Sequence, residues 1–125
     1  MNTSSMPRVL IPYLAFTLLL ASLAYAADLS GTWSGWIPGP DGYTGAVLTI
    51  AAAGDSLTGT MQRGEETLPI ADVNVRGDTF SFDTRIGGGV VFHYCTVSGD
   101  SIRMLISEPR GPETQVILHR EPESK

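Results

Sequence analysis

Two histidines and a single cysteine are the residues of this 125-residue chain best suited to metal or nucleophilic chemistry. His93 and Cys95 are two positions apart, so on a β-strand both side chains would point to the same side. A zinc site would need further ligands, from His119 or an acid, and the sequence offers no second closely spaced pair. The plainer interpretation is a half-buried imidazole beside a small apolar thiol, and we predict no metal and no cofactor.

Hydrolytic chemistry has equally little support. A serine nucleophile usually lies on a tight elbow such as Gly-x-Ser-x-Gly, and the chain holds no such pentapeptide. Two carboxylates could act together on a glycosidic bond, but acids on a solvated sheet face are the common case. The acids that could meet in this way are Glu65, Glu66, Asp83, Glu108 and Glu113. We therefore predict no catalytic residues, and a small hydrolase is the least favoured alternative.

Aromatic side chains are better candidates for a binding role. Trp36 comes three residues after Trp33, so the two indoles would point to opposite faces of one strand. If Trp33 is buried, Trp36 points outward or toward a rim near Tyr43, where the pair would suit a sugar face or a partner protein. The alternative is that Trp36 covers one end of the fold. With His93 and Tyr94, Trp36 and Tyr43 form our predicted ligand-binding set.

A repeated turn indicates the framework that would hold these residues. Gly-Asp-Ser/Thr followed by a large apolar residue occurs at 54–57, 77–80 and 99–102, with spacings of 23 and 22 residues. Glycine accepts the positive φ of tight hairpin turns, and two strands with their turns occupy about 22 residues. The pattern predicts an antiparallel meander in which Gly77 has a structural role.

The segments between the turns give eight strands, several with alternating apolar and polar residues. They are 31–37, 43–52, 57–63, 67–76, 79–86, 90–98, 101–107 and 114–121. Such a meander can close into a barrel or split into a sandwich, and we favour closure because it removes both exposed edges. We predict an all-β fold: a small eight-stranded antiparallel up-and-down barrel, filled by side chains or admitting one small ligand at its mouth.

The first and last strands resemble those of lipocalin-like and avidin-like barrels. Gly31-Thr32-Trp33 is similar to the Gly-x-Trp that opens such barrels, and Arg120 ends the last strand where they often place a basic residue across that Trp. Closure would make the two strands neighbours and let the guanidinium lie on the indole face. Trp33 and Arg120 are therefore expected to be structural.

Nearly the whole mature chain resembles a small calycin-like β-domain found alone or beside catalytic domains, such as α/β-hydrolases, in secreted bacterial proteins. The segments that carry the likeness are 31–35, 57–60, 68–73, the Gly-Asp turns and 116–120. The chain departs from the pattern at Cys95, where a glycine often follows the Tyr of the sixth strand, and its 125 residues hold no hydrolase domain. The resemblance implies a compact exported accessory module rather than an activity.

The N-terminus has the features of a secretory signal peptide. Residues 9–23 are mainly apolar and 24–26 form a small-x-small site, so we expect cleavage after Ala26. The alternative is an uncleaved membrane anchor, since the run is almost long enough to span a bilayer. We predict a signal peptide at 1–26, a barrel domain at 27–121 and a disordered tail at 122–125, in a secreted or periplasmic protein without stable membrane insertion after cleavage.

Charge narrows the range of partners. The leader holds one of the eight basic residues and none of the thirteen acids, which leaves the mature chain a formal net charge of −6. An acidic chain without a basic run argues against nucleic acid and anionic membranes. We expect an exported non-enzymatic binding or accessory module that recognises a small ligand, a glycan or an envelope protein through one barrel mouth. The alternative is a lipocalin-like protease inhibitor, whose residues 27–30 would have to be extended and free of the barrel.

Overall fold

The computed structural model describes residues 29–54 and 56–122. The predicted signal peptide, its cleavage site and residues 123–125 of the predicted tail lie outside the described residues. Within the described ranges, no helix combines the length and the apolar character needed to cross a bilayer.

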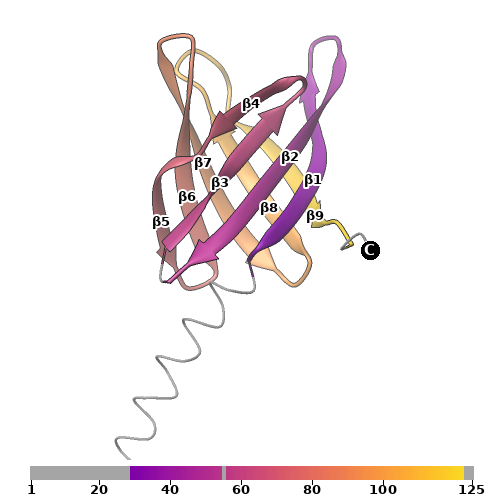
Figure 1. Ribbon diagram of the computed structural model, residues 1–125. Helices are drawn as coiled ribbons and strands as arrows, with labels where there is room; N and C mark the ends of the chain where they lie inside the picture. Colours follow the sequence, from indigo (N-terminus) through magenta and orange to yellow (C-terminus); the bar gives the residue numbers. More distant parts are fainter. Residues whose placement is uncertain (1–28, 55, 123–125) are drawn as a thin grey trace, which may run out of the picture.

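The described residues form one antiparallel sheet that curls into a barrel (Figure 1). Its strands are β1 (Gly31–Gly39), β2 (Gly42–Ala53), β3 (Ser56–Arg63), β4 (Glu66–Pro69), β5 (Ala71–Arg76), β6 (Thr79–Ile86), β7 (Gly89–Ser98), β8 (Ser101–Ser107) and β9 (Thr114–Arg120). The first strand pairs with the last through Trp33–Arg120 and Ser34–His119. This pairing confirms the predicted up-and-down barrel and excludes the sandwich.

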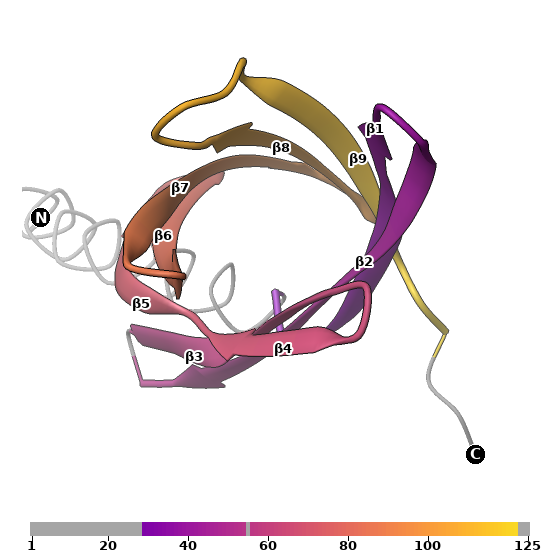
Figure 2. The ribbon, with the colours of Figure 1, turned by 90° about the horizontal axis from the view of Figure 1, so that it is seen from above.

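The prediction of a single fourth strand over 67–76, and with it the count of eight strands, is wrong. β4 pairs with β3 and β5 pairs with β6, and β4 and β5 are the two edges of the nine-stranded sheet (Figure 2). Pro69 has no N–H to donate to a ladder, and Asp72 has a φ of 52° beside a register shift between Ala71 and Asn74. The bulge carries the chain from one neighbour to the other, so the barrel is nearly closed.

Alternation along the strands fills the interior with apolar side chains. The inward rows that the sequence indicates on β3, β6 and β8 are buried, and Trp33 is fully buried among them. The core consists mainly of Trp33, Leu48, Leu57, Met61, Phe80, Phe82, Ile102, Met104, Ile106 and Leu118. Most of the large apolar residues of the described strands point inward, so closure of the sheet buries them.

The two ends of the barrel differ. We call the end with the β2–β3, β5–β6 and β7–β8 turns the floor, and the end with the β1–β2, β3–β4 and β6–β7 hairpins and the β8–β9 loop the mouth (Figure 1). At the floor, Trp33 Nε1 donates a hydrogen bond to the carbonyl of buried Leu29 at 3.0 Å. Gly77 and Gly99 open two-residue floor turns with φ of 59° and 60°, as expected for turns whose first position needs glycine.

Candidate functional site at the barrel mouth

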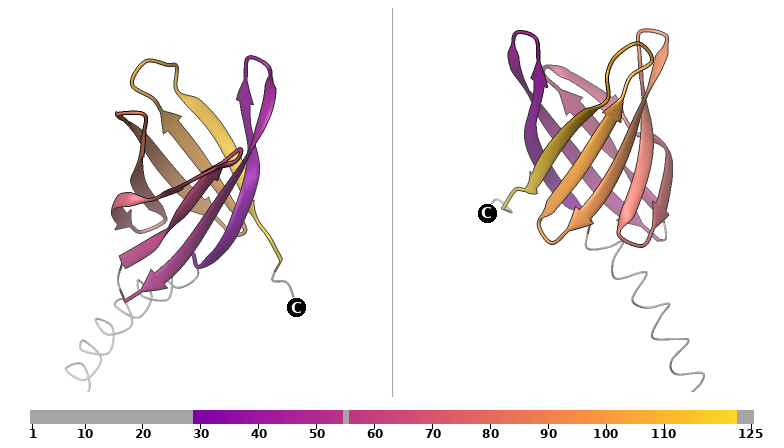
Figure 3. Two further views of the ribbon diagram at one scale, coloured as in Figure 1. Left: turned by 45° about the horizontal axis from the view of Figure 1, so that its top comes forward. Right: turned by 180° about the vertical axis from the view of Figure 1, so that it is seen from behind.

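A hollow of about 560 Å³ lies at the mouth, between the β6–β7 hairpin and the β8–β9 loop. These two connections rise side by side at the same end of the barrel, as the rear view in Figure 3 shows. Ile86 and Val91 face inward on β6 and β7, which makes the inner end of the hollow apolar, while Glu108 and Arg110 place charge at its rim. The remaining lining comes from Gly87, Gly88, Gly89, Pro109 and Gly111.

Glycines keep this hollow open. Gly87 and Gly88 have φ of 54° and 87°, which few other residues adopt, so this hairpin end presents backbone instead of side chains. A Cβ on Gly89 would lie 3.4 Å from Cγ of Pro109, across the hollow. Side-chain bulk at Gly89 would therefore narrow the space between the hairpin and the loop.

An ion pair spans the mouth beside the hollow. Arg63 Nη1 lies 3.4 Å from Glu108 Oε1, and both side chains are about one-third exposed. β3 and β8 are separated by β2, β1 and β9 in the sheet, so the contact crosses the barrel rather than following its wall. Sequence reasoning missed the pair, although Arg63 continues the inward row of Leu57 and Met61 and Glu108 continues that of Ile106.

His93 is the next inward residue below Val91 on β7. It is buried, its ring stacks on Phe82 with centroids 4.4 Å apart, and within the described residues its Nδ1 has no hydrogen-bond partner. Burial lowers the pKa of His93 from 6.5 to about 4; nearby Arg63 lowers it further, whereas the backbone of Phe82 and Glu108 act in the opposite direction. The imidazole is therefore neutral at pH 7.

The depressed pKa has a defined effect on stability. Between pH 6.5 and about 4, the unfolded chain binds a proton at His93 that the folded chain does not. The free energy of unfolding consequently falls as the pH drops through this window. Above the window His93 is neutral in both the folded and the unfolded chain, so it does not lower the stability. A neutral buried imidazole with an unpartnered nitrogen is also a hydrogen-bonding group for any molecule that reaches it.

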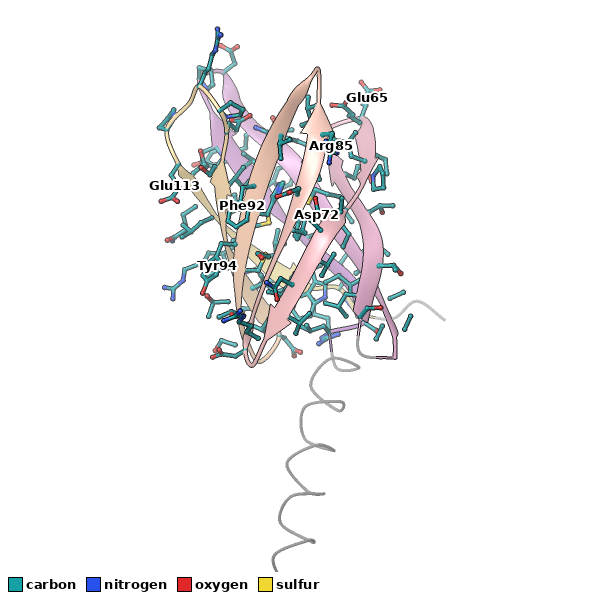
Figure 4. All side chains as sticks on the ribbon, turned by 90° about the vertical axis from the view of Figure 1, so that its left-hand side faces the viewer. Glu65, Asp72, Arg85, Phe92, Tyr94 and Glu113 are labelled. Atoms are coloured by element: carbon teal, nitrogen blue, oxygen red, sulfur yellow. The ribbon has the colours of Figure 1, made fainter. Side chains whose placement is uncertain are left out.

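The predicted ligand-binding set does not form one site. Trp36 and Tyr43 lie together on the outer face of the β1–β2 hairpin, whereas His93 points into the barrel. Tyr94 projects from the outer wall of β7 beside Phe92, as Figure 4 shows. Consecutive residues of a strand point to opposite faces, so His93 and Tyr94 could not share a site on one wall.

The remaining chemical candidates are dispersed. His93 and Cys95 do share the inward face, and burial raises the pKa of the Cys95 thiol above its usual value. Across the described part of the chain, no three His, Cys, Asp or Glu side chains are grouped to hold a metal ion. Glu65 and Glu113 lie at opposite edges of the barrel in Figure 4.

One carboxylate pair does form, on the outer wall. Burial and the neighbouring Asp72 carboxylate raise the pKa of Asp83, while Arg85 lowers it. Arg85 Nη2 also lies 4.0 Å from Asp72 Oδ2, and both of these side chains are largely exposed (Figure 4). The pair belongs to the bulge between β5 and β6, so we regard it as part of that bend.

The start of the described chain is fastened to the barrel. Leu29 is buried at the floor, Ser30 Oγ accepts a hydrogen bond from Ala52 N at 3.0 Å, and the Ser30 carbonyl accepts one from Arg120 Nη1 at 2.9 Å. Residues 29 and 30 are therefore not free to insert into a protease, which argues against the inhibitor alternative. Residues 27 and 28 lie outside the described residues.

Comparison with known proteins reveals the fold only. No family model and no curated protein sequence matches the chain. A solved structure described as the REP1-NXSQ fatty acid transporter is similar at a TM-score of 0.56 and 14% identity, over 78% of this chain and 99% of that one. A mutant of the fluorescent protein UnaG is similar at a TM-score of 0.52 and 12% identity, over 76% and 97%. The chain therefore shares an antiparallel β-barrel fold with both of these proteins.

Proposed function

We propose that this barrel is a non-enzymatic module that binds a small hydrophobic ligand, such as a fatty acid, at its mouth. The observation that carries the proposal is the hollow of about 560 Å³, whose inner end is formed by Ile86 and Val91, two apolar residues that pack with the barrel core. Ligand pockets typically have volumes of about 300–1,000 Å³, few polar groups and mainly hydrophobic lining. The likeness to a fatty acid transporter supports the same class of ligand.

The charge at the rim suits an amphiphile. An acyl chain would contact Ile86 and Val91, and its carboxylate would lie at the rim beside Arg110. A group that reached deeper would meet the unpartnered Nδ1 of His93. The leader-like N-terminus and the resemblance to β-domains of exported bacterial proteins support a secreted or periplasmic role.

Displacement of a fluorescent fatty acid by dodecanoate tests the proposal with two neighbouring substitutions. Gly89→Phe adds a ring inside the hollow, and we expect it to weaken binding by about tenfold or more. Val90→Phe places the same ring one residue later, where the side chain is 42% exposed on the outer wall, and should leave binding unchanged. Failure of the unmodified protein to bind, or equal affinity in all three proteins, would refute the proposal.

A further inference from the structure

An aromatic pair stands exposed on the outer wall, away from the hollow. Trp36 is 66% exposed and Tyr43 is 73% exposed, whereas Trp33 on the same strand is fully buried. The register pairs Trp36 with Gly45 and Pro38 with Tyr43, so both aromatic rings belong to the outward face of the β1–β2 hairpin. They line a shared shallow depression. The barrel core is complete without either ring, so packing does not account for them.

The indole also borders a longer groove of about 620 Å³ that crosses β1, β2 and β9. Its apolar lining consists of Trp36, Val47 and Ile117. Gly45, the cross-strand partner of Trp36, contributes no side chain, and a Cβ there would lie 3.7 Å from the indole. The neighbouring strand therefore leaves the indole ring uncovered.

Polar groups on β1 and β9 also line this groove. Ser34 and His119 face each other on the last rung of the β1–β9 ladder, and Glu121 follows one outward position later on the chain. Ser101 Oγ lies 3.4 Å from His119 Nδ1 and helps to hold the imidazole. The backbone N–H of Glu121 donates to the Thr32 carbonyl at 2.8 Å, which fixes this residue beside β1. A hydroxyl on β1 thus faces the groove, with an imidazole and a carboxylate beside it at the β9 edge.

This combination matches the two kinds of surface on a sugar ring. A pyranose has a C–H face that packs on an aromatic ring, and hydroxyls at its edge that both donate and accept hydrogen bonds. Acyl chains would leave the polar edge unused, and an acidic ligand would meet Glu121 in a chain with excess negative charge. A β-linked glucose or N-acetylglucosamine unit fits best, because its ring substituents are equatorial and leave the C–H face flat.

We propose that the groove on the outer wall of β1, β2 and β9 is a carbohydrate-binding site for β-linked oligosaccharides. One sugar ring stacks on Trp36, a second contacts Tyr43, and hydroxyls of the chain bond to His119 and Glu121. The site is separate from the mouth hollow, so it holds or fails independently of ligand binding inside the barrel.

Titration calorimetry with chitohexaose and cellohexaose tests the site on the mature chain. We expect at least one of them to bind with a dissociation constant between about 10 µM and 1 mM. Trp36→Ala should weaken binding by about tenfold or more, and Trp36→Phe, which keeps a flat ring, should weaken it less. Phe92→Ala is the matched control, because Phe92 is an exposed aromatic residue on β7, which β8 separates from the groove, and its loss should not affect binding.

Tryptophan fluorescence gives a second measurement of sugar binding. The chain has two, and Trp33 is buried, so a change of indole fluorescence on adding the sugar should disappear in Trp36→Ala. Absence of binding by both hexasaccharides, binding of maltohexaose alone, or unchanged affinity in Trp36→Ala would overturn the proposal. Trp36-dependent binding to phosphatidylcholine vesicles without sugar binding would instead assign the aromatic pair to a lipid surface, which also overturns it.

Discussion

The contact between Arg120 and Trp33 joins the last strand of the barrel to the first, and substitutions at the two residues should be energetically coupled. The guanidinium carbon of Arg120 lies 4.2 Å from the centroid of the Trp33 ring, and its Nη1 donates to the Ser30 carbonyl. Arg120 Nε also lies 3.1 Å from Asp100 Oδ1. The Arg120 side chain is only 25% exposed, so the cation over the indole is largely desolvated. Arg120→Met keeps much of the aliphatic stem and removes all three interactions.

The burial of each group sets the free energy that each interaction of Arg120 contributes. A partly desolvated cation–π contact contributes about 1–2 kcal/mol, and a hydrogen bond from a charged donor about 1.5–3 kcal/mol. The ion pair adds little, at most about 1 kcal/mol, because the Asp100 side chain is 85% exposed. Arg120→Met should therefore lower the free energy of unfolding by about 2.5–6 kcal/mol, of which about 1–2 kcal/mol is coupling to Trp33.

Urea unfolding of four proteins measures the coupling. The four proteins are the unmodified chain, Trp33→Leu, Arg120→Met and the double variant. Their unfolding is monitored by far-ultraviolet circular dichroism, because Trp33→Leu removes an indole. We expect the double variant to be less destabilised than the sum of the single variants by about 1–2 kcal/mol. Asp100→Asn in place of Arg120→Met is the control and should be nearly additive with Trp33→Leu. Additivity within about 0.3–0.5 kcal/mol for Arg120→Met would refute the reasoning.

Three further predictions concern the turns and the interior. Gly77→Val should destabilise the protein by about 1–3 kcal/mol in thermal unfolding, because φ is 59° at this position, and Gly77→Asn should destabilise it less. Equal melting temperatures for Gly77→Val and the unmodified protein would contradict the turn geometry. Cys95 should react with a thiol reagent only after unfolding, and rapid labelling of the folded protein would show that the thiol is accessible. His93→Phe should reduce the loss of stability between pH 7 and 4.5 by about 2–3 kcal/mol, and an unchanged pH dependence would show that the imidazole is not the buried neutral group.

Much of the fold can be read from short-range patterns. The Gly-Asp turns and the alternation on β3, β6 and β8 place the hairpins and the inward rows correctly, because both depend on neighbouring residues only. The contact between Trp33 and Arg120 also follows from the meander, since closure makes the first and last strands neighbours.

The break between β4 and β5 is harder to foresee. Pro69 is a visible signal, because proline weakens a central strand. The decisive feature is the positive φ of Asp72, and aspartate adopts that conformation too rarely for the sequence to indicate it. The chain leaves β3 for β6 at this point because of tertiary pairing, which no local pattern records.

The candidate site, like the fold, can be predicted from the sequence only in part. Parity alone separates inward His93 from outward Tyr94 and places Arg63 and Glu108 inside the mouth. The hollow itself arises where the β6–β7 hairpin meets the β8–β9 loop, segments about twenty residues apart in sequence. The hollow depends on the conformation of these two connections. In the sequence, Gly87–Gly89 indicates only that the hairpin end is flexible.

Ligand binding at the mouth is the central claim, and an NMR titration tests it most directly. Dodecanoate would be added to uniformly ¹⁵N-labelled protein comprising residues 27–125 while amide shifts are followed. We predict that the largest shift changes fall on the β6–β7 hairpin and the β8–β9 loop, at Gly87–Gly89 and Arg110–Gly111, and that these changes are saturable. No saturable change, or changes confined to the outer wall of β1, β2 and β9, would contradict the claim.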